Sequence, residues 1–217
     1  MVQNPAKPAS HSDLDELDKK DNILYHARNF FQQKSFDGVN IREIMQAAGV
    51  SQPTIYYYFQ NKDGLFLAVL LDILAEIDHE FNRASCESNL FDQLQYIAQA
   101  FTDLPAPNLP MLFQELRQRV ELNQRFPEQG ITTQQARSAF LYVNLVWPQS
   151  LENMLREARQ YGEAAVDNPA FTAHYLLTVF TAYPHSPFNS LASRLTVAAL
   201  MDYLKNSLKM INTSAQI

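Results

Sequence analysis

Apolar residues recur at helical spacing along most of the chain, and the first clear repeat lies in residues 21–34. Its stripe is formed by Ile23, Leu24, Ala27, Phe30 and Phe31. Apolar positions three and four residues apart are typical of a helix that packs one face against a core. The preceding residues 1–20 contain prolines, serines and charges of both signs, so they are predicted to form a mobile arm.

Two short helices separated by a tight turn are predicted in residues 40–60. Asn40 is a suitable N-cap for the first helix, and Gly49 follows its last apolar residue, where a left-handed backbone is least costly as glycine. Ser51 can cap the second helix, and Pro53 falls in its first turn, where no backbone N–H is needed. This order is typical of a helix-turn-helix, whose second helix enters the major groove of DNA.

A long apolar helix is predicted to connect this segment to a larger helical region. From Lys62, apolar residues continue at helical spacing to about Ala84. Further helices are expected at residues 90–104, 111–126, 132–161, 168–183 and 189–211. Pro148 is expected to kink or split the third of these five, because proline removes a backbone hydrogen bond. The predicted fold class is all-α with about nine helices: a three-helix domain at residues 21–66 and a larger one at residues 67–217.

Composition limits the classes of function. The chain has 217 residues, of which 47% are hydrophobic, so it can bury a sizeable core. Its net charge of −6 argues against a protein that coats nucleic acid non-specifically, although a local DNA-facing surface depends on where the charges lie. The single cysteine, Cys86, cannot form an intramolecular disulfide. With no leader and no apolar run near 18 residues, we expect a cytoplasmic protein without membrane contact.

The sequence offers little support for catalysis. The five histidines are scattered, and His79-Glu80 lacks the second histidine that the zinc-binding helix motif requires. We therefore expect no enzyme activity, no bound metal and no cofactor. His174 lies on an otherwise apolar helix, and we expect a core histidine there, with a ligand contact as the alternative.

Four short motifs follow one another in a fixed register. They are R-E-I at Arg42–Ile44, A-A-G-V-S at Ala47–Ser51, T-I-Y-Y-Y-F at Thr54–Phe59 and N-K-D-G-L-F at Asn61–Phe66. The series resembles the DNA-binding segment of the TetR family of bacterial regulators. With the preceding helix, the resemblance covers about 45 residues. The rest of the chain is similar to the family only in helical character and length.

The resemblance and the residue types together indicate a DNA-contacting surface. Its candidates are Arg42, Ser51, Gln52, Pro53, Thr54, Tyr56, Tyr57, Tyr58 and Lys62. Gln52 can pair with adenine, the tyrosine hydroxyls can reach phosphates, and Lys62 lies at a helix N-terminus that favours anions. Core packing is the alternative for the tyrosines, but Ile55 and Phe59 already occupy the inward positions of this helix.

The resemblance also implies that residues 67–217 bind a small-molecule effector and form a homodimer. Aromatic and flexible residues on the segments that would line the pocket are Phe101, Met111, Phe113, Phe140, Tyr142, Trp147 and Tyr175. Ordinary helix-core packing is the alternative for each of them. The last two predicted helices, residues 168–183 and 189–211, would supply the dimer interface.

The expected function is that of a dimeric transcriptional repressor. It would bind a palindromic DNA operator and be released by an effector whose identity the sequence does not specify. The alternative is a helical ligand-binding protein whose helix-turn-helix has lost its affinity for DNA, and the acidic net charge motivates this alternative.

Overall fold

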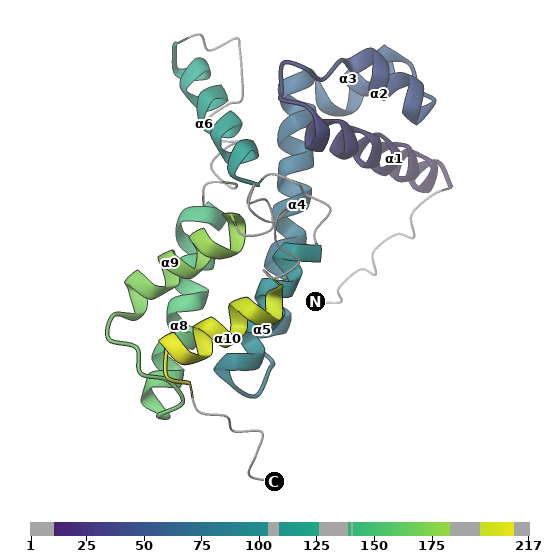
Figure 1. Cartoon of the computed structure of the whole chain (residues 1–217). Coiled ribbons are helices and arrows are strands. Elements are labelled where there is room, and N and C mark those ends of the chain that lie inside the picture. Colours follow the sequence, from purple (N-terminus) through teal and green to yellow (C-terminus); the bar gives the residue numbers. More distant parts are fainter. Residues whose placement is uncertain (1–10, 104–108, 126–138, 140, 183–195, 211–217) are drawn as a thin grey trace, which may run out of the picture. The chain divides into compact units, whose positions relative to one another are not determined.

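The structure, a computed structural model, describes residues 11–103, 109–125, 139, 141–182 and 196–210 (Figure 1). All regular structure in these residues is helical, with nine α-helices and one π-helical turn, which confirms the all-α prediction. The elements are α1 (His11–Gln33), α2 (Ile41–Ala48), α3 (Gln52–Phe59), α4 (Lys62–Ala84), α5 (Leu90–Asp103), α6 (Leu109–Arg125), η1 (Tyr142–Val146), α8 (Trp147–Gln160), α9 (Pro169–Ala182) and α10 (Val197–Ser207). None of the helices described could span a membrane.

The start of α1 corrects the predicted arm. Residues 1–10 lie outside the described residues, but residues 11–20 are helical, so the helix begins ten residues before its predicted start at residue 21. Buried side chains at Ile23, Ala27 and Phe31 hold the later turns in place. Extending an existing helix costs much less than nucleating one, because each added residue brings its own hydrogen bond. A polar segment can therefore be helical without an apolar stripe of its own.

The chain divides into two compact units, residues 1–69 and residues 70–217, which we call the N-terminal and C-terminal units. The division falls inside α4, so one continuous helix contributes its first two turns to the N-terminal unit and the remainder to the C-terminal unit.

Three phenylalanines form the centre of the N-terminal unit. The rings of Phe31 and Phe36 lie edge-on to Phe66 at centroid distances of 5.3 and 5.4 Å, respectively. They join α1, the segment after it and the start of α4. Asn22 adds a hydrogen bond between α1 and α2. Its side-chain amide donates to the carbonyl of Ala48, at the end of α2, at 2.9 Å.

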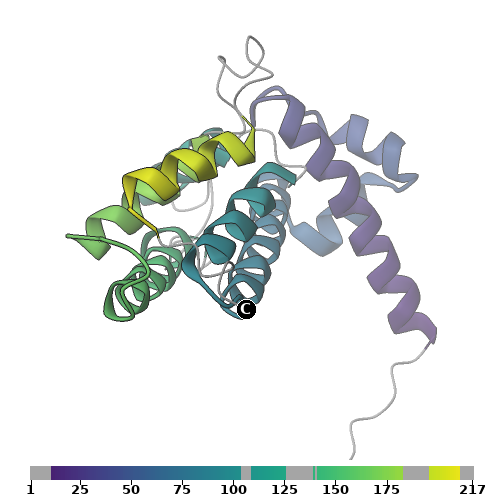
Figure 2. The same ribbon diagram turned by 60° about the horizontal axis from the view of Figure 1, so that its bottom comes forward.

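Four aromatic residues form the centre of the C-terminal unit. Trp147 stacks on Phe81 at 5.8 Å with an interplanar angle of 4°, and its indole lies edge-on to Phe101 at 6.1 Å. Phe101 in turn stacks on Phe180 at 6.2 Å. These contacts join α4, α5, α8 and α9, and further contacts pack α8 along α9 and α10 along α5 (Figures 1 and 2).

The prediction of a helix break at Pro148 is confirmed, and the structure specifies its form. Residues 142–146 make a π-helical turn, and a new helix, α8, begins at Trp147 with Pro148 in its first turn. Proline has no N–H to donate and its ring crowds the carbonyl four residues earlier, so the regular ladder cannot pass through this point. Residues 132–138 of the predicted helix lie outside the described residues.

The last predicted helix is shorter at its C-terminal end. We predicted residues 189–211; α10 covers Val197–Ser207, with residues 189–195 and 211 outside the described residues. The chain leaves the helix at Leu208, whose carbonyl accepts from the backbone N–H of Ala165 at 2.9 Å. Lys209 then adopts a positive φ of 47°, which is incompatible with a continuing right-handed helix.

Candidate nucleic-acid interface

The ends of α2 and α3 are fixed by the residues that the sequence indicated. The side chain of Asn40 accepts a hydrogen bond from the N–H of Arg42 at 2.9 Å, and Gly49 ends α2 with a φ of 66°. The Ser51 hydroxyl accepts from the N–H of Thr54 at 3.4 Å. These caps satisfy backbone groups that a short helix leaves without partners, so they set the angle at which α3 leaves the turn.

The helix α3 has a buried face and a polar outer face. Ile55 and Phe59 are buried, whereas Tyr56 and Tyr57 have 39% and 73% of their surface exposed. Gln52 and Pro53 are also exposed at the start of the helix. The amide of Gln52 donates to the hydroxyl of Tyr56 at 3.1 Å, which orients both groups on the outer face.

Three of the candidate residues on this helix take part in packing or capping. Tyr58 is half-buried, with its ring edge-on to Tyr57 at 5.1 Å and tilted against Phe59 at 6.1 Å. The hydroxyls of Ser51 and Thr54 lie 2.8 Å apart within the cap. If one of these three side chains contacts DNA, it would have to do so while it keeps its packing or capping interaction.

A hollow of about 550 Å³ lies beside α3. Four of the candidate residues line it together, namely Arg42, Gln52, Tyr56 and Lys62, along with the segment 37–41. The ammonium of Lys62 lies 4.5 Å from the centre of the Phe36 ring, a cation–π contact that positions the charge at the start of α4. Asp37 is also part of the lining, so the hollow combines two cations with one acidic group.

The acidic residue of α2 is neutralised within the protein. Both carboxylate oxygens of Glu43 accept from the ammonium of Lys34 at 2.8 Å, which ties α1 to α2. This hydrogen bond is the main cause that lowers the pKa of Glu43 below its usual value, with a smaller contribution from the backbone N–H of Asn40. Glu43 therefore carries a charge that is compensated by Lys34 before any phosphate approaches.

The corner between α3 and α4 depends on two residues whose importance the sequence did not indicate. Gln60 ends α3 with a φ of 65°, a left-handed conformation that is uncommon outside glycine. At Gly64, a Cβ atom would fall far inside van der Waals contact with the carbonyl oxygen of Phe59. The side chain of Asn61 accepts from the N–H of Gly64 at 2.8 Å, so the first turn of α4 is capped close against the end of α3.

The candidate effector residues have different surroundings in the structure. Phe101 is buried in the aromatic core, Met111 is half-buried and Tyr175 has 48% of its surface exposed. Phe113 and Trp147 line cavities in the C-terminal unit. Phe140 and the side chain of Tyr142 lie outside the described residues.

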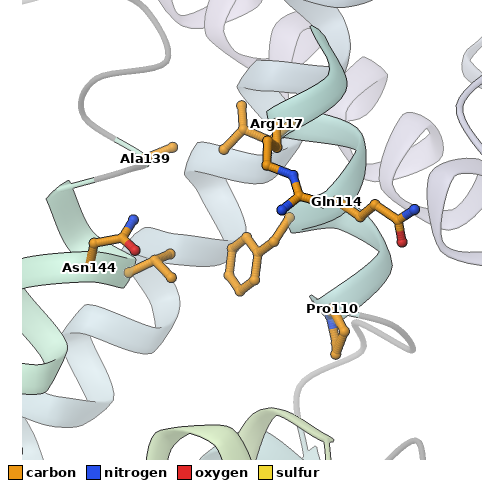
Figure 3. Close-up of a pocket in the computed structure, with 8 residues that line it drawn as sticks. Pro110, Gln114, Arg117, Ala139 and Asn144 are labelled. Atoms are coloured by element: carbon orange, nitrogen blue, oxygen red, sulfur yellow. The ribbon is translucent and has the colours of Figure 1, made fainter. Parts of the chain in front are cut away.

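Among the residues that the structure describes, two cavities of about 310 and 390 Å³ lie in the C-terminal unit. The first, shown in Figure 3, includes Arg117 and Asn144 in its lining. The second includes His174, which is exposed and not the core histidine that we predicted. Ala173 and Leu176 of α9 are buried in the core, whereas His174 lies on the exposed side of the helix with Phe171 and Tyr175. No local sequence signal marked Arg117 or Asn144, which are 27 residues apart.

These observations define a helix-turn-helix protein with a second, helical unit that contains cavities. The family profile described as "Bacterial regulatory proteins, tetR family" matches residues 23–69. This helix-turn-helix segment is therefore of the TetR-family type.

Individual relatives match only part of the chain. The "HTH-type transcriptional regulator RutR" of Escherichia coli K12 is 36% identical over 74 residues, 34% of this chain and 35% of the relative. The "HTH-type transcriptional repressor ComR" of the same organism is 35% identical over 95 residues, 41% of this chain and 45% of the relative. The aligned segments thus span less than half of either relative.

Solved structures extend the similarity of fold to most of the chain. AibR, crystallised in complex with isovaleryl coenzyme A and operator DNA, matches with a TM-score of 0.64 at 17% identity. The match covers 88% of this chain and 97% of AibR. At this identity the comparison shows a shared fold.

Proposed function

We propose that the protein is a homodimeric transcriptional regulator that represses genes by binding a palindromic operator and is released from it by a small-molecule effector. The observation that supports this most directly is the outer face of α3. Gln52 and Tyr56 lie there beside the hollow that also contains Arg42 and Lys62. Exposed tyrosines with oriented polar groups next to two cations are suited to a DNA groove and its phosphates.

In the proposed complex, two copies of α3 enter successive major grooves about 34–36 Å apart. Gln52 can read an adenine edge from the N-terminal end of the helix. The Tyr57 hydroxyl extends to the phosphate backbone, and Lys62 binds a phosphate where the N-terminus of α4 adds free N–H groups. Because the chain is acidic as a whole, affinity depends on these few contacts and on dimerisation.

Exposed aromatic residues on the last two helices support the dimer. On α9, Phe171 and Tyr175 have 69% and 48% of their surface exposed, and on α10 Tyr203 has 60% exposed. Large apolar side chains on a monomer's surface are typical of an interface. A two-fold axis would bring α9 and α10 together with their copies in a four-helix bundle. Light scattering should then give twice the mass of one chain at micromolar concentration, and a monomer would contradict the proposal.

The effector would act through α4. Trp147 lines a cavity and stacks on Phe81 of α4, and the same helix begins at Lys62 beside the DNA-facing hollow. A ligand that moves Trp147 can therefore change the position of α4. To lower operator occupancy a hundredfold, it must favour the released state by about 2.7 kcal/mol.

Fluorescence anisotropy with DNA from upstream of the protein's own gene tests the proposal. Affinity should fall steeply with salt, because phosphate contacts release counterions. Tyr57→Ala should weaken binding at least tenfold, and Lys62→Met should also lower the salt dependence, by a slope of about 2 for a dimer. Tyr161→Ala is the matched control, because Tyr161 has the same exposed fraction, 73%, but lies in the C-terminal unit.

The second candidate function is ligand binding without DNA binding, which the net charge of −6 favours. It predicts that the upstream DNA shows no salt-dependent binding. It also predicts that Tyr57→Ala and Tyr161→Ala give the same anisotropy signal with this DNA. That result would reject the regulator and leave the C-terminal unit as the functional part.

A further inference from the structure

The two cavities of the C-terminal unit adjoin each other. Pro110, Phe113 and Val143 belong to the lining of both. With volumes of about 310 and 390 Å³, each is at the small end of the range for ligand pockets. A molecule that occupied both would be elongated and would pass between α6 and the π-helical turn η1.

The larger cavity is suited to an apolar group. Trp147, Pro148 and Leu177 supply much of its lining. It also contains two threonines, but their hydroxyls already donate within α9. Thr178 donates to the carbonyl of His174 at 2.9 Å, and Thr181 donates to the carbonyl of Leu177 at 2.8 Å. With their protons used in this way, neither hydroxyl can donate to an anion.

The smaller cavity has the opposite character. Figure 3 shows the guanidinium of Arg117 extending from α6 into the space that faces Ala139 and Asn144, whereas the amide of Gln114 points away. The nearby Arg119 is paired with Glu115 at 3.6 Å, while Arg117 has no ion-pair partner among the residues that the structure describes. The described lining of either cavity includes no aspartate or glutamate.

We infer that the effector is an amphipathic carboxylate, with its apolar body beside Trp147 and its carboxylate bound by Arg117. This inference depends on the proposed function only in that it assigns the ligand to the effector site. A guanidinium binds a carboxylate through two parallel hydrogen bonds, and Asn144 adds a polar group to the lining of the same cavity. The apolar body would displace water from the larger cavity, where both threonine hydroxyls already donate within α9.

His174 is the other group that could bind the carboxylate. Its Nδ1 donates to the carbonyl of Ala170 at 2.9 Å, so Nε2 can donate to a carboxylate only when the ring carries a second proton. Binding at His174 would reverse the orientation of the ligand. The two side chains therefore have to be tested separately.

Titration calorimetry and the fluorescence of Trp147, the single tryptophan, can measure binding of defined probes to the full chain. The probes are hydrocinnamate and octanoate, each compared with its own neutral amide. We expect both carboxylates to bind and to change the tryptophan emission, and each amide to bind at least tenfold more weakly. Arg117→Gln should weaken carboxylate binding about tenfold and leave the amides unchanged.

Two variants serve as controls. Arg156→Gln removes an exposed arginine elsewhere in the C-terminal unit and should leave binding of all four probes unchanged. His174→Gln should also retain carboxylate binding. The inference is overturned if neither carboxylate binds, if the amides bind as tightly, or if His174→Gln reduces carboxylate affinity and Arg117→Gln does not.

The DNA-binding assay separates this inference from the proposed function. If upstream DNA binds with the expected salt dependence but the carboxylates do not bind, only the ligand class is wrong. If the carboxylates bind through Arg117 but no DNA binds, the ligand class stands and the regulator is rejected.

Discussion

Tyr57 in the N-terminal unit and Trp147 in the C-terminal unit are both large aromatic residues near a proposed site. Tyr57 has 73% of its surface exposed, whereas Trp147 has only 1% exposed. The tyrosine belongs to a row on the outside of α3, where a rigid ring can reach a partner at small entropic cost. The tryptophan contributes one face to a packed aromatic core and lines a cavity. The same residue class therefore supports binding in one unit by exposure and in the other by shaping the core.

The helix α4 takes part in both arrangements. It contributes Phe66 to the aromatic trio of the N-terminal unit and Phe81 to the aromatic core of the C-terminal unit. The contrast between the units thus predicts which substitutions will affect stability and which will affect binding alone.

Truncation of the two aromatic residues should give the largest difference. Trp147→Ala removes a buried ring that stacks on Phe81, so the free energy of unfolding should fall by about 3–5 kcal/mol. Tyr57→Ala removes an exposed ring and should change the free energy of unfolding by no more than about 0.5 kcal/mol. Urea denaturation followed by circular dichroism measures both. Equal destabilisation by the two variants would show that the contrast in packing is wrong.

Substitution of two glycines in the N-terminal unit should give a smaller difference in the free energy of unfolding. A methyl group at Gly64 would collide with the backbone carbonyl of Phe59, so Gly64→Ala should cost about 1–3 kcal/mol and weaken DNA binding by displacing α3 from α4. Gly49 has a φ of 66° but open space around its Cβ position, so Gly49→Ala should cost only about 1 kcal/mol.

The same denaturation experiment with an added DNA titration compares the glycine variants. If Gly64→Ala is as stable as the parent and binds DNA equally well, the close contact at the α3–α4 corner is not required. Gly49→Ala controls for the loss of a glycine as such.

The helix-turn-helix could be predicted from the sequence because its signals are local. Asn40, Gly49 and Ser51 each act on backbone groups within four residues, and the structure confirms all three caps. The break at Pro148 was predictable for the same reason. Its π-helical form was not, because it depends on how the preceding turn accommodates the ring.

The polar residues of the smaller cavity could not be predicted, because tertiary packing brings them together. Arg117 on α6 and Asn144 on η1 have no common motif, and the aromatic residues that the sequence favoured include Phe101, which belongs to the core. Gly64 illustrates the same limit. Its role depends on the approach of a carbonyl from the preceding helix, which no local pattern marks.

The smallest predicted effect concerns the ion pair between α1 and α2, and it tests how the N-terminal unit neutralises its acidic groups. The hydrogen bond from Lys34 lowers the pKa of Glu43 in the folded protein below the usual 4.5. A lowered pKa means that the pair stabilises the fold above pH 4.5 and that this contribution is lost as the pH falls through the folded value. The stability difference between the parent and Glu43→Gln should therefore be constant above pH 4.5 and shrink below it.

Asp21→Asn, at an exposed position of α1, is the surface control. Because the Lys34 and Glu43 side chains are 38% and 40% exposed, the difference should also decrease in high salt. An unchanged pH dependence in Glu43→Gln would show that the pair does not hold α1 against α2, and that the charge of Glu43 is free to oppose DNA.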